Sequence, residues 1–123
     1  LAPIIDQIKK LGVRVSLFME TDAQQIEKAA ALGADRIEFY TGPYAEHFHD
    51  NKEIAIEPYV KAAKVAQALG LGINAGHDLN LDNLAKYASI PALLEVSIGH
   101  AFTVDSLAMG MANAVNAYLQ RLR

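Results

Sequence analysis

The sequence predicts an α/β fold in which parallel strands alternate with helices. Apolar side chains recur at every second residue in short segments, and they recur at helical spacing between those segments. In addition, a Leu-Gly pair follows a helix-like segment and precedes a strand-like one at Leu11-Gly12, Leu32-Gly33 and Leu69-Gly70. Glycine there is typical of a left-handed helix C-cap. The recurrence therefore predicts a repeated joint from helix to strand.

The first half of the chain is predicted to hold two strand-helix units after an initial helix end. Residues 13–20 alternate apolar and polar side chains, which predicts a strand that stops at Glu20. Thr21 and Gln24 have the spacing of a capping box, and they open a helix that runs through Leu32. A second strand is expected at residues 36–40. Residues 41–57 are expected to form a long loop that can hold a helical turn.

The second half repeats the pattern twice. Pro58 suits the first position of a helix, and residues 71–74 follow as a short strand. Asn80 is expected to cap the next helix, and residues 93–98 form the fourth strand. A final helix is predicted because apolar residues recur at helical spacing in Val104, Leu107, Met111, Val115, Tyr118, Leu119 and Leu122.

Strands and helices in this order predict a parallel sheet with helices packed outside it. Four parallel strands make about half of an eight-stranded barrel, for which about 250 residues are typical. A flavodoxin-like open sheet is the alternative, but it usually has about five strands and a glycine-rich phosphate loop that this sequence lacks. The chain opens inside a helix without an initiator Met, so we expect a piece of a longer chain.

Composition narrows the class of partner. The 123 residues include no cysteine, which excludes a disulfide framework, a thiol nucleophile and a thiolate metal site, and suits a cytoplasmic protein. The formal charge is −3, and basic residues are not gathered beside aromatic ones, so we expect no nucleic-acid partner. No apolar run approaches the ~18 residues of a membrane span, so no membrane partner is expected. The expected partner is a small molecule.

Polar residues stand where the predicted strands end, and ligand sites of parallel α/β folds form at that edge. His77 follows the third strand, and an imidazole can give or take a proton near neutral pH, so His77 is our first candidate for a general acid or base. A histidine that only hydrogen-bonds its loop is the alternative. Glu38 alternates with Ile37 and Phe39, which turns it away from the helices. Its alternative is a structural ion pair with Arg36.

Two further segments are candidate sites. Gly99 and His100 close the fourth strand and open the last helix, where backbone N–H groups can hold a phosphate. His47 and His49 lie near acidic residues and could in principle ligate a metal ion. An exposed polar loop explains them, and no third ligand is evident. We therefore expect no metal site.

Four segments carry a likeness to a known family, namely residues 13–18, 37–44, 71–79 and 97–101. In this order and spacing they resemble the pyridoxine 5'-phosphate synthase family of vitamin B6 biosynthesis, and the likeness covers essentially the whole chain. The resemblance implies a (β/α)8 TIM barrel, a single domain of which residues 1–123 supply the C-terminal half, about four strand-helix units. It also implies a homo-oligomer and no metal or organic cofactor.

The family is known for one condensation. It joins 1-deoxy-D-xylulose 5-phosphate to 3-amino-2-oxopropyl phosphate and gives pyridoxine 5'-phosphate, phosphate and water. By motif match, His77 resembles the family's proton donor and Glu38 the carboxylate that stabilises the transition state. Asp78, Gly99 and His100 resemble the segment that holds the aminooxopropyl phosphate. Position 78 is Gly or Asp in the family, so the contact there is expected to run through the backbone.

Other parts of the family's site are absent from this sequence. The family's first half supplies an Asn-x-Asp-His motif, a His and Arg pair and a catalytic Glu, so the chain alone is expected to be inactive. Either another half completes the barrel or two copies pair. Another phosphate-binding aldolase or isomerase and a non-catalytic half-barrel module are the alternatives. An aldolase more often shows a Schiff-base lysine at a strand end, whereas the lysines here fall on predicted helices or loops: Lys9, Lys10, Lys28, Lys52, Lys61, Lys64 and Lys86.

Overall fold

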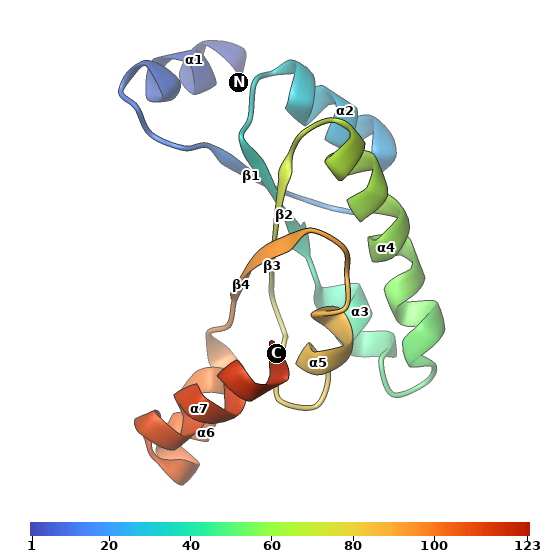
Figure 1. Cartoon of the computed structure of the whole chain (residues 1–123), viewed down its shortest axis with the longest axis vertical. Coiled ribbons are helices and arrows are strands. Elements are labelled where there is room, and N and C mark those ends of the chain that lie inside the picture. Colours follow the sequence, from blue (N-terminus) through green and yellow to red (C-terminus); the bar gives the residue numbers. More distant parts are fainter.

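The computed structural model describes all residues from 1 to 123 as a row of parallel strands joined by helices (Figure 1). The strand and helix alternation predicted from the sequence is confirmed. In chain order the elements are α1 (Ala2–Lys10), β1 (Ser16–Met19), α2 (Ala23–Ala31), β2 (Arg36–Tyr40), α3 (Gly42–His47), α4 (Lys52–Ala68), β3 (Gly72–Gly76), α5 (Leu84–Tyr87), β4 (Leu93–Ser97), α6 (His100–Met109) and α7 (Met111–Arg121).

The strands lie in the sheet in the order β1-β2-β3-β4, and every neighbouring pair is parallel. This consecutive order is that of a barrel segment. A flavodoxin-like sheet reverses its strand order at a switch point, so that alternative is wrong. The sheet does not close on itself, and the structure is therefore a partial barrel.

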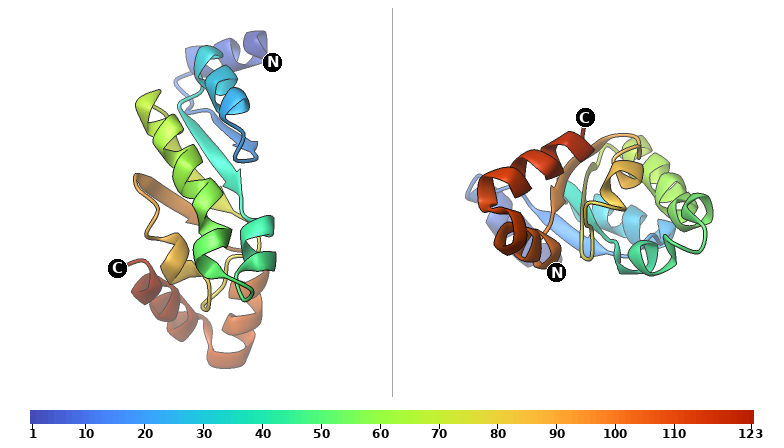
Figure 2. Two further views of the ribbon diagram at one scale, coloured as in Figure 1. Left: turned by 90° about the vertical axis from the view of Figure 1, so that its right-hand side faces the viewer. Right: turned by 90° about the horizontal axis from the view of Figure 1, so that it is seen from below.

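Helices α2, α3, α4 and α5 lie on one side of the sheet, and α6 and α7 lie beyond the end of β4 (Figures 1 and 2). In β2, Ile37 and Phe39 are fully buried toward the helices, while the alternating residues Arg36, Glu38 and Tyr40 are only half-buried. Phe18 on β1 is 61% exposed. The face that would line a barrel interior is thus open. No helix of the chain is both long enough and apolar enough to span a membrane.

The three Leu-Gly joints have the predicted conformation. Gly12, Gly33 and Gly70 have φ values of 75°, 81° and 75°. A side chain strains this region, whereas glycine adopts it freely. Each of these glycines donates its N–H to a carbonyl three residues back, which closes the helix before the chain enters the next strand.

Some predicted boundaries are wrong. Asp22, not Thr21, caps α2, because its carboxylate accepts a hydrogen bond from the Gln25 N–H at 2.9 Å. Residues 41–57 hold α3 and the start of α4. Asn51 caps α4 by accepting from two N–H groups at 3.1 Å, so the helix starts early and Pro58 lies inside it.

Two other boundaries also differ from the prediction. The third strand runs to Gly76, two residues beyond the predicted end. The predicted last helix is two helices, because Gly110 has a φ of 86° and separates α6 from α7. Its residues therefore do not share one buried face, and Leu107 is 85% exposed.

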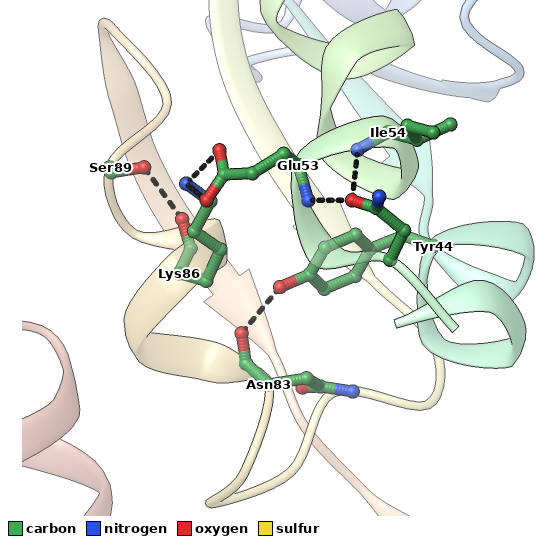
Figure 3. Close-up of polar contacts among 7 residues, drawn as sticks. Tyr44, Glu53, Ile54, Asn83, Lys86 and Ser89 are labelled. Carbon is green, nitrogen blue, oxygen red and sulfur yellow. Dashed lines mark hydrogen bonds and ion pairs between the residues drawn. The ribbon is translucent and has the colours of Figure 1, made fainter. Parts of the chain in front are cut away.

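An ion pair ties the short helix α5 to α4. The Lys86 ammonium lies 2.6 and 2.7 Å from the two carboxylate oxygens of Glu53 (Figure 3). The hydrogen bond from Lys86 lowers the pKa of Glu53 below its ordinary value. This contact fixes α5, which follows the loop after β3, against the longest helix.

Candidate active site

The loop after β3 presents an imidazole and a carboxylate side by side. His77 Nδ1 lies 2.9 Å from Asp78 Oδ2, and both side chains are a little more than half exposed. The His77 ring meets the Tyr40 ring edge to face, with centroids 4.9 Å apart. His77 thus stands at the carboxyl end of β3, against a residue from the end of β2.

The neighbouring carboxylate determines which ring nitrogen of His77 carries the proton. An ionised carboxylate only accepts hydrogen bonds, so Nδ1 must be the donor to Asp78. Nε2 makes no hydrogen bond within the chain. In the protonated ring Nε2 therefore carries the proton that can be given to a bound molecule.

Glu38 lies on the open face of β2 with a space next to it. A Cβ atom on Gly76 would come within 2.6 Å of Glu38 Oε1, so the glycine makes room for this carboxylate. The predicted alternative of an Arg36–Glu38 ion pair is wrong. Arg36 instead donates to Asn74 Oδ1 and to Glu95 Oε2, each at 3.0 Å. Glu38 has no ion-pair partner in the chain.

A cavity of about 500 Å³ opens between the loops that follow β2, β3 and β4. It brings together the three residues singled out as a phosphate-holding segment, Asp78, Gly99 and His100. Glu38 and His77 are not among its lining residues. The remaining lining residues are Tyr40, Gly42, Pro43, Ala45, Glu46, Leu79, Asn80 and Ala101.

The start of α6 borders this cavity with the N–H groups of its first turn. Gly99 is the N-cap residue and has no side chain, so no side-chain cap occupies the free N–H groups of the first turn. Such N–H groups, together with the helix dipole, favour negative charge. His100, the first helical residue, lines the same cavity.

The chain holds neither a cluster of metal ligands nor a lysine at a strand end. No group of three or more His, Cys, Asp or Glu side chains is placed to hold a metal ion. His47 Nδ1 lies 3.5 Å from Asp50 on the exposed end of α3 and faces no third ligand. Lysine is absent from the strand ends, because every lysine lies in a helix.

Buried tyrosines pack behind the site, and the sequence did not single them out. Tyr44, Tyr59 and Tyr87 meet edge to face, with centroid distances of 5.0 to 6.0 Å. Burial raises the pKa of Tyr59 to about 12, and it also raises the pKa values of Tyr44 and Tyr87. These phenols stay protonated at neutral pH. The Tyr59 hydroxyl donates to the backbone oxygen of Tyr40 at 2.8 Å.

Sequence reasoning placed Tyr40 and Thr41 at the end of the second strand but assigned them no role. Both stand at the end of β2, where the rule that located His77 and Gly99 applies equally. Any side chain at Gly42 would overlap the Tyr40 ring, so the glycine after Thr41 was the available signal.

Comparison with known proteins shows which family the chain resembles. The family model described as "Pyridoxal phosphate biosynthesis protein PdxJ" matches residues 1–123. A pyridoxine 5'-phosphate synthase of Cytophaga hutchinsonii is 52% identical over 124 aligned residues, covering 100% of this chain and 52% of that protein. A pyridoxine 5'-phosphate synthase of Porphyromonas gingivalis is 49% identical, and the alignment covers 99% of this chain and 52% of that protein. A pyridoxine 5'-phosphate synthase of Xanthomonas campestris is 54% identical, and the alignment covers 97% of this chain and 47% of that protein. The chain spans about half the length of these curated relatives.

Proposed function

Because this chain belongs to the PdxJ family of pyridoxal phosphate biosynthesis proteins, we propose that it supplies half of the active site of a pyridoxine 5'-phosphate synthase. The proposed reaction condenses 1-deoxy-D-xylulose 5-phosphate with 3-amino-2-oxopropyl phosphate. The observation that carries the proposal is the meeting of three loops at the carboxyl ends of β2, β3 and β4 around one cavity. A (β/α)8 enzyme builds its site at that end.

His77 is proposed as the proton donor. Ring closure removes water and inorganic phosphate, and each leaving oxygen departs more readily when it receives a proton. The Asp78 carboxylate accepts a hydrogen bond from Nδ1–H, so the protonated ring donates its proton to the substrate from Nε2. Because the Asp78 carboxylate is engaged in this way, the expected contribution of residue 78 to phosphate binding comes from its backbone.

Glu38 is proposed to stabilise the transition state. When an amine condenses with a carbonyl group, positive charge develops on the nitrogen. A carboxylate on the open face of β2 with no cation of its own can balance that charge. Gly76 keeps the space beside this carboxylate free.

The phosphate group of the aminooxopropyl substrate is proposed to bind at the start of α6. Gly99 and His100 line the cavity there, beside N–H groups that have no partner within the helix. The remaining catalytic groups of the reaction come from the part of the family's barrel that this chain does not include.

We further propose a cytoplasmic homo-oligomer. The substrates are charged phosphate esters, which do not cross a membrane unaided, and this supports a cytoplasmic site of action. Exposed apolar residues on α6 and α7, such as Leu107 at 85% and Met111 at 67%, support assembly with further copies.

The test uses a closed barrel. In this protein, the chimeric barrel, our chain replaces the segment of the Cytophaga hutchinsonii relative that it matches. With both phosphorylated substrates, the chimeric barrel should release pyridoxine 5'-phosphate, measured by chromatography of the product. A folded chimeric barrel that consumes neither substrate would refute the proposed function. Sodium borohydride trapping separates it from a Schiff-base aldolase, because no covalent adduct with a lysine of this chain is expected.

A further inference from the structure

Two consecutive residues in the loop after β3 have left-handed backbone conformations. The φ values are 94° for His77 and 57° for Asp78. Residues with a Cβ atom adopt such values at an energetic cost, and they persist only where the surroundings hold them. Neither residue is a glycine, so the contacts around the loop must supply what holds it.

Two buried side chains bind the carbonyl oxygens of these two residues. Thr41 Oγ1 donates to the backbone oxygen of His77, and Asn83 Nδ2 donates to that of Asp78 at 3.1 Å. Thr41 is 0% exposed and Asn83 is 2% exposed. The loop therefore has its backbone fixed to the interior while its imidazole and carboxylate remain on the surface of the site.

Both side chains are themselves anchored. The Thr41 N–H donates to the backbone oxygen of Gly76 at 3.0 Å, which continues the pairing of β2 with β3. Asn83 Oδ1 accepts from the Asn80 N–H at 2.9 Å and closes the loop on itself. The buried Tyr44 hydroxyl donates to the backbone oxygen of Asn83 at 2.7 Å (Figure 3). Asn83 is thus connected to the tyrosines behind the site.

We propose that Thr41 and Asn83 are positioning residues, which hold the strained His77-Asp78 pair so that the imidazole is presented for proton transfer. The proposal rests on the proposed function of His77. Neither side chain touches the substrate in this account, since both act through backbone oxygens. Without them the loop would relax toward ordinary backbone conformations and move the ring. A displacement of about 1 Å can reduce turnover by about a hundredfold.

The experiment compares isosteric variants of the chimeric barrel. Thr41→Val removes the hydroxyl with little change of shape, and Thr41→Ser keeps it. Asn83→Asp keeps the acceptor for Asn80 and removes the donor to Asp78. Ser89→Ala is the matched control, because it removes a hydroxyl that binds a carbonyl at 2.7 Å on the exposed surface of the same region (Figure 3). Hydrogen exchange of the peptide 76–83, kcat and KM are measured for each variant.

Thr41→Val and Asn83→Asp should exchange faster in peptide 76–83 and lose about tenfold to a hundredfold in kcat, with KM unchanged. Thr41→Ser should restore both readouts, and Ser89→Ala should match the parent. Parent-like kcat in Thr41→Val overturns the proposal, as does an equal loss of kcat in Thr41→Ser. If the parent chimeric barrel forms no product, the proposed function fails. The exchange data then decide separately whether the two side chains hold the loop, and parent-like exchange in Thr41→Val overturns that part as well.

Discussion

Gly76 shows how one absent side chain shapes the candidate site. It is the last residue of β3, and on the open face of the sheet it adjoins Glu38 on β2 and Ser97 on β4. Its backbone conformation is available to any residue, because it is not among those with positive φ. Its role is therefore to provide space.

Gly76→Ala in the chimeric barrel should reduce turnover far more than stability. The new Cβ would lie 2.6 Å from Glu38 Oε1, the mobile end of a flexible side chain, so the carboxylate moves and the fold is kept. We expect a loss of about tenfold or more in kcat. The urea midpoint should change little. Unchanged kcat would remove Glu38 from the mechanism.

At the scale of single residues, the sequence predicted which polar positions follow the strands but not what holds them there. His77, Gly99 and His100 follow the third and fourth predicted strands, so they were found by reading the residues at the strand ends. Their chemical roles remain proposals. Thr41 and Asn83 were not found, because their importance depends on backbone oxygens that lie 36 and 5 residues away in the chain.

At the scale of elements, one carboxylate holds the first helix and the first strand to the second unit. Asp35 Oδ2 accepts from the Val15 N–H at 2.8 Å, and Asp35 Oδ1 lies 3.0 Å from Lys9 Nζ. The backbone hydrogen bond from Val15, followed by Lys9, lowers the pKa of Asp35 below its ordinary value of 3.8.

This contact should contribute stability that disappears in acid. Because the pKa of Asp35 is lower in the folded state than in the unfolded state, the contribution is fully present above the unfolded value near 3.8 and is lost as the pH falls through the folded value. The difference in the free energy of unfolding between the unsubstituted chain and its Asp35→Asn variant should thus shrink as the pH falls below the unfolded value near 3.8. Urea titrations at several pH values measure it.

A companion variant tests which partner dominates. Lys9→Met keeps the Val15 hydrogen bond, the largest cause of the shift, so most of the pH dependence should survive. If Lys9→Met removes the whole pH dependence, the ion pair with Lys9, and not the hydrogen bond from the Val15 N–H, lowers the pKa of Asp35.

Element boundaries were predicted correctly at the Leu-Gly joints and for β2. They were missed at two helix caps and at β1, where alternation over residues 13–20 predicted a longer strand than Ser16–Met19. The three Leu-Gly joints and β2 follow directly from local sequence. In contrast, Asp22 and not Thr21 caps α2, and Asn51 caps α4, which therefore begins before Pro58. Thr21 and Asp22 are adjacent residues of similar capping preference, so local sequence did not separate them. Asn51 lies seven residues before Pro58, and its capping hydrogen bonds were not predicted.

At the scale of the whole molecule, the chain exposes more surface than a compact monomer of its mass. Its accessible surface is 7246 Å², whereas a folded 13.3 kDa monomer is expected to expose about 6,450 Å². Part of the excess is the face of the sheet opposite the helices. A (β/α)8 barrel fills its interior with side chains from such a face.

Phe18→Ala should therefore affect the chain and the chimeric barrel differently. In the chain, Phe18 is 61% exposed, and its truncation should change the free energy of unfolding by about 0.5 kcal/mol or less. In the chimeric barrel the ring becomes interior, and the loss should be about 3 kcal/mol. Urea unfolding of both proteins measures it. Equal small losses in the two would show that the chimera does not close around this face.

The central claim is that His77, at the end of β3, supplies the proton for ring closure. The most direct measurement is the rate of pyridoxine 5'-phosphate formation by the chimeric barrel with His77→Gln, beside His47→Gln on the exposed α3 as the matched control. The account predicts a loss of about a hundredfold or more for His77→Gln and a parent-like rate for His47→Gln. A parent-like rate in a folded His77→Gln variant would contradict it.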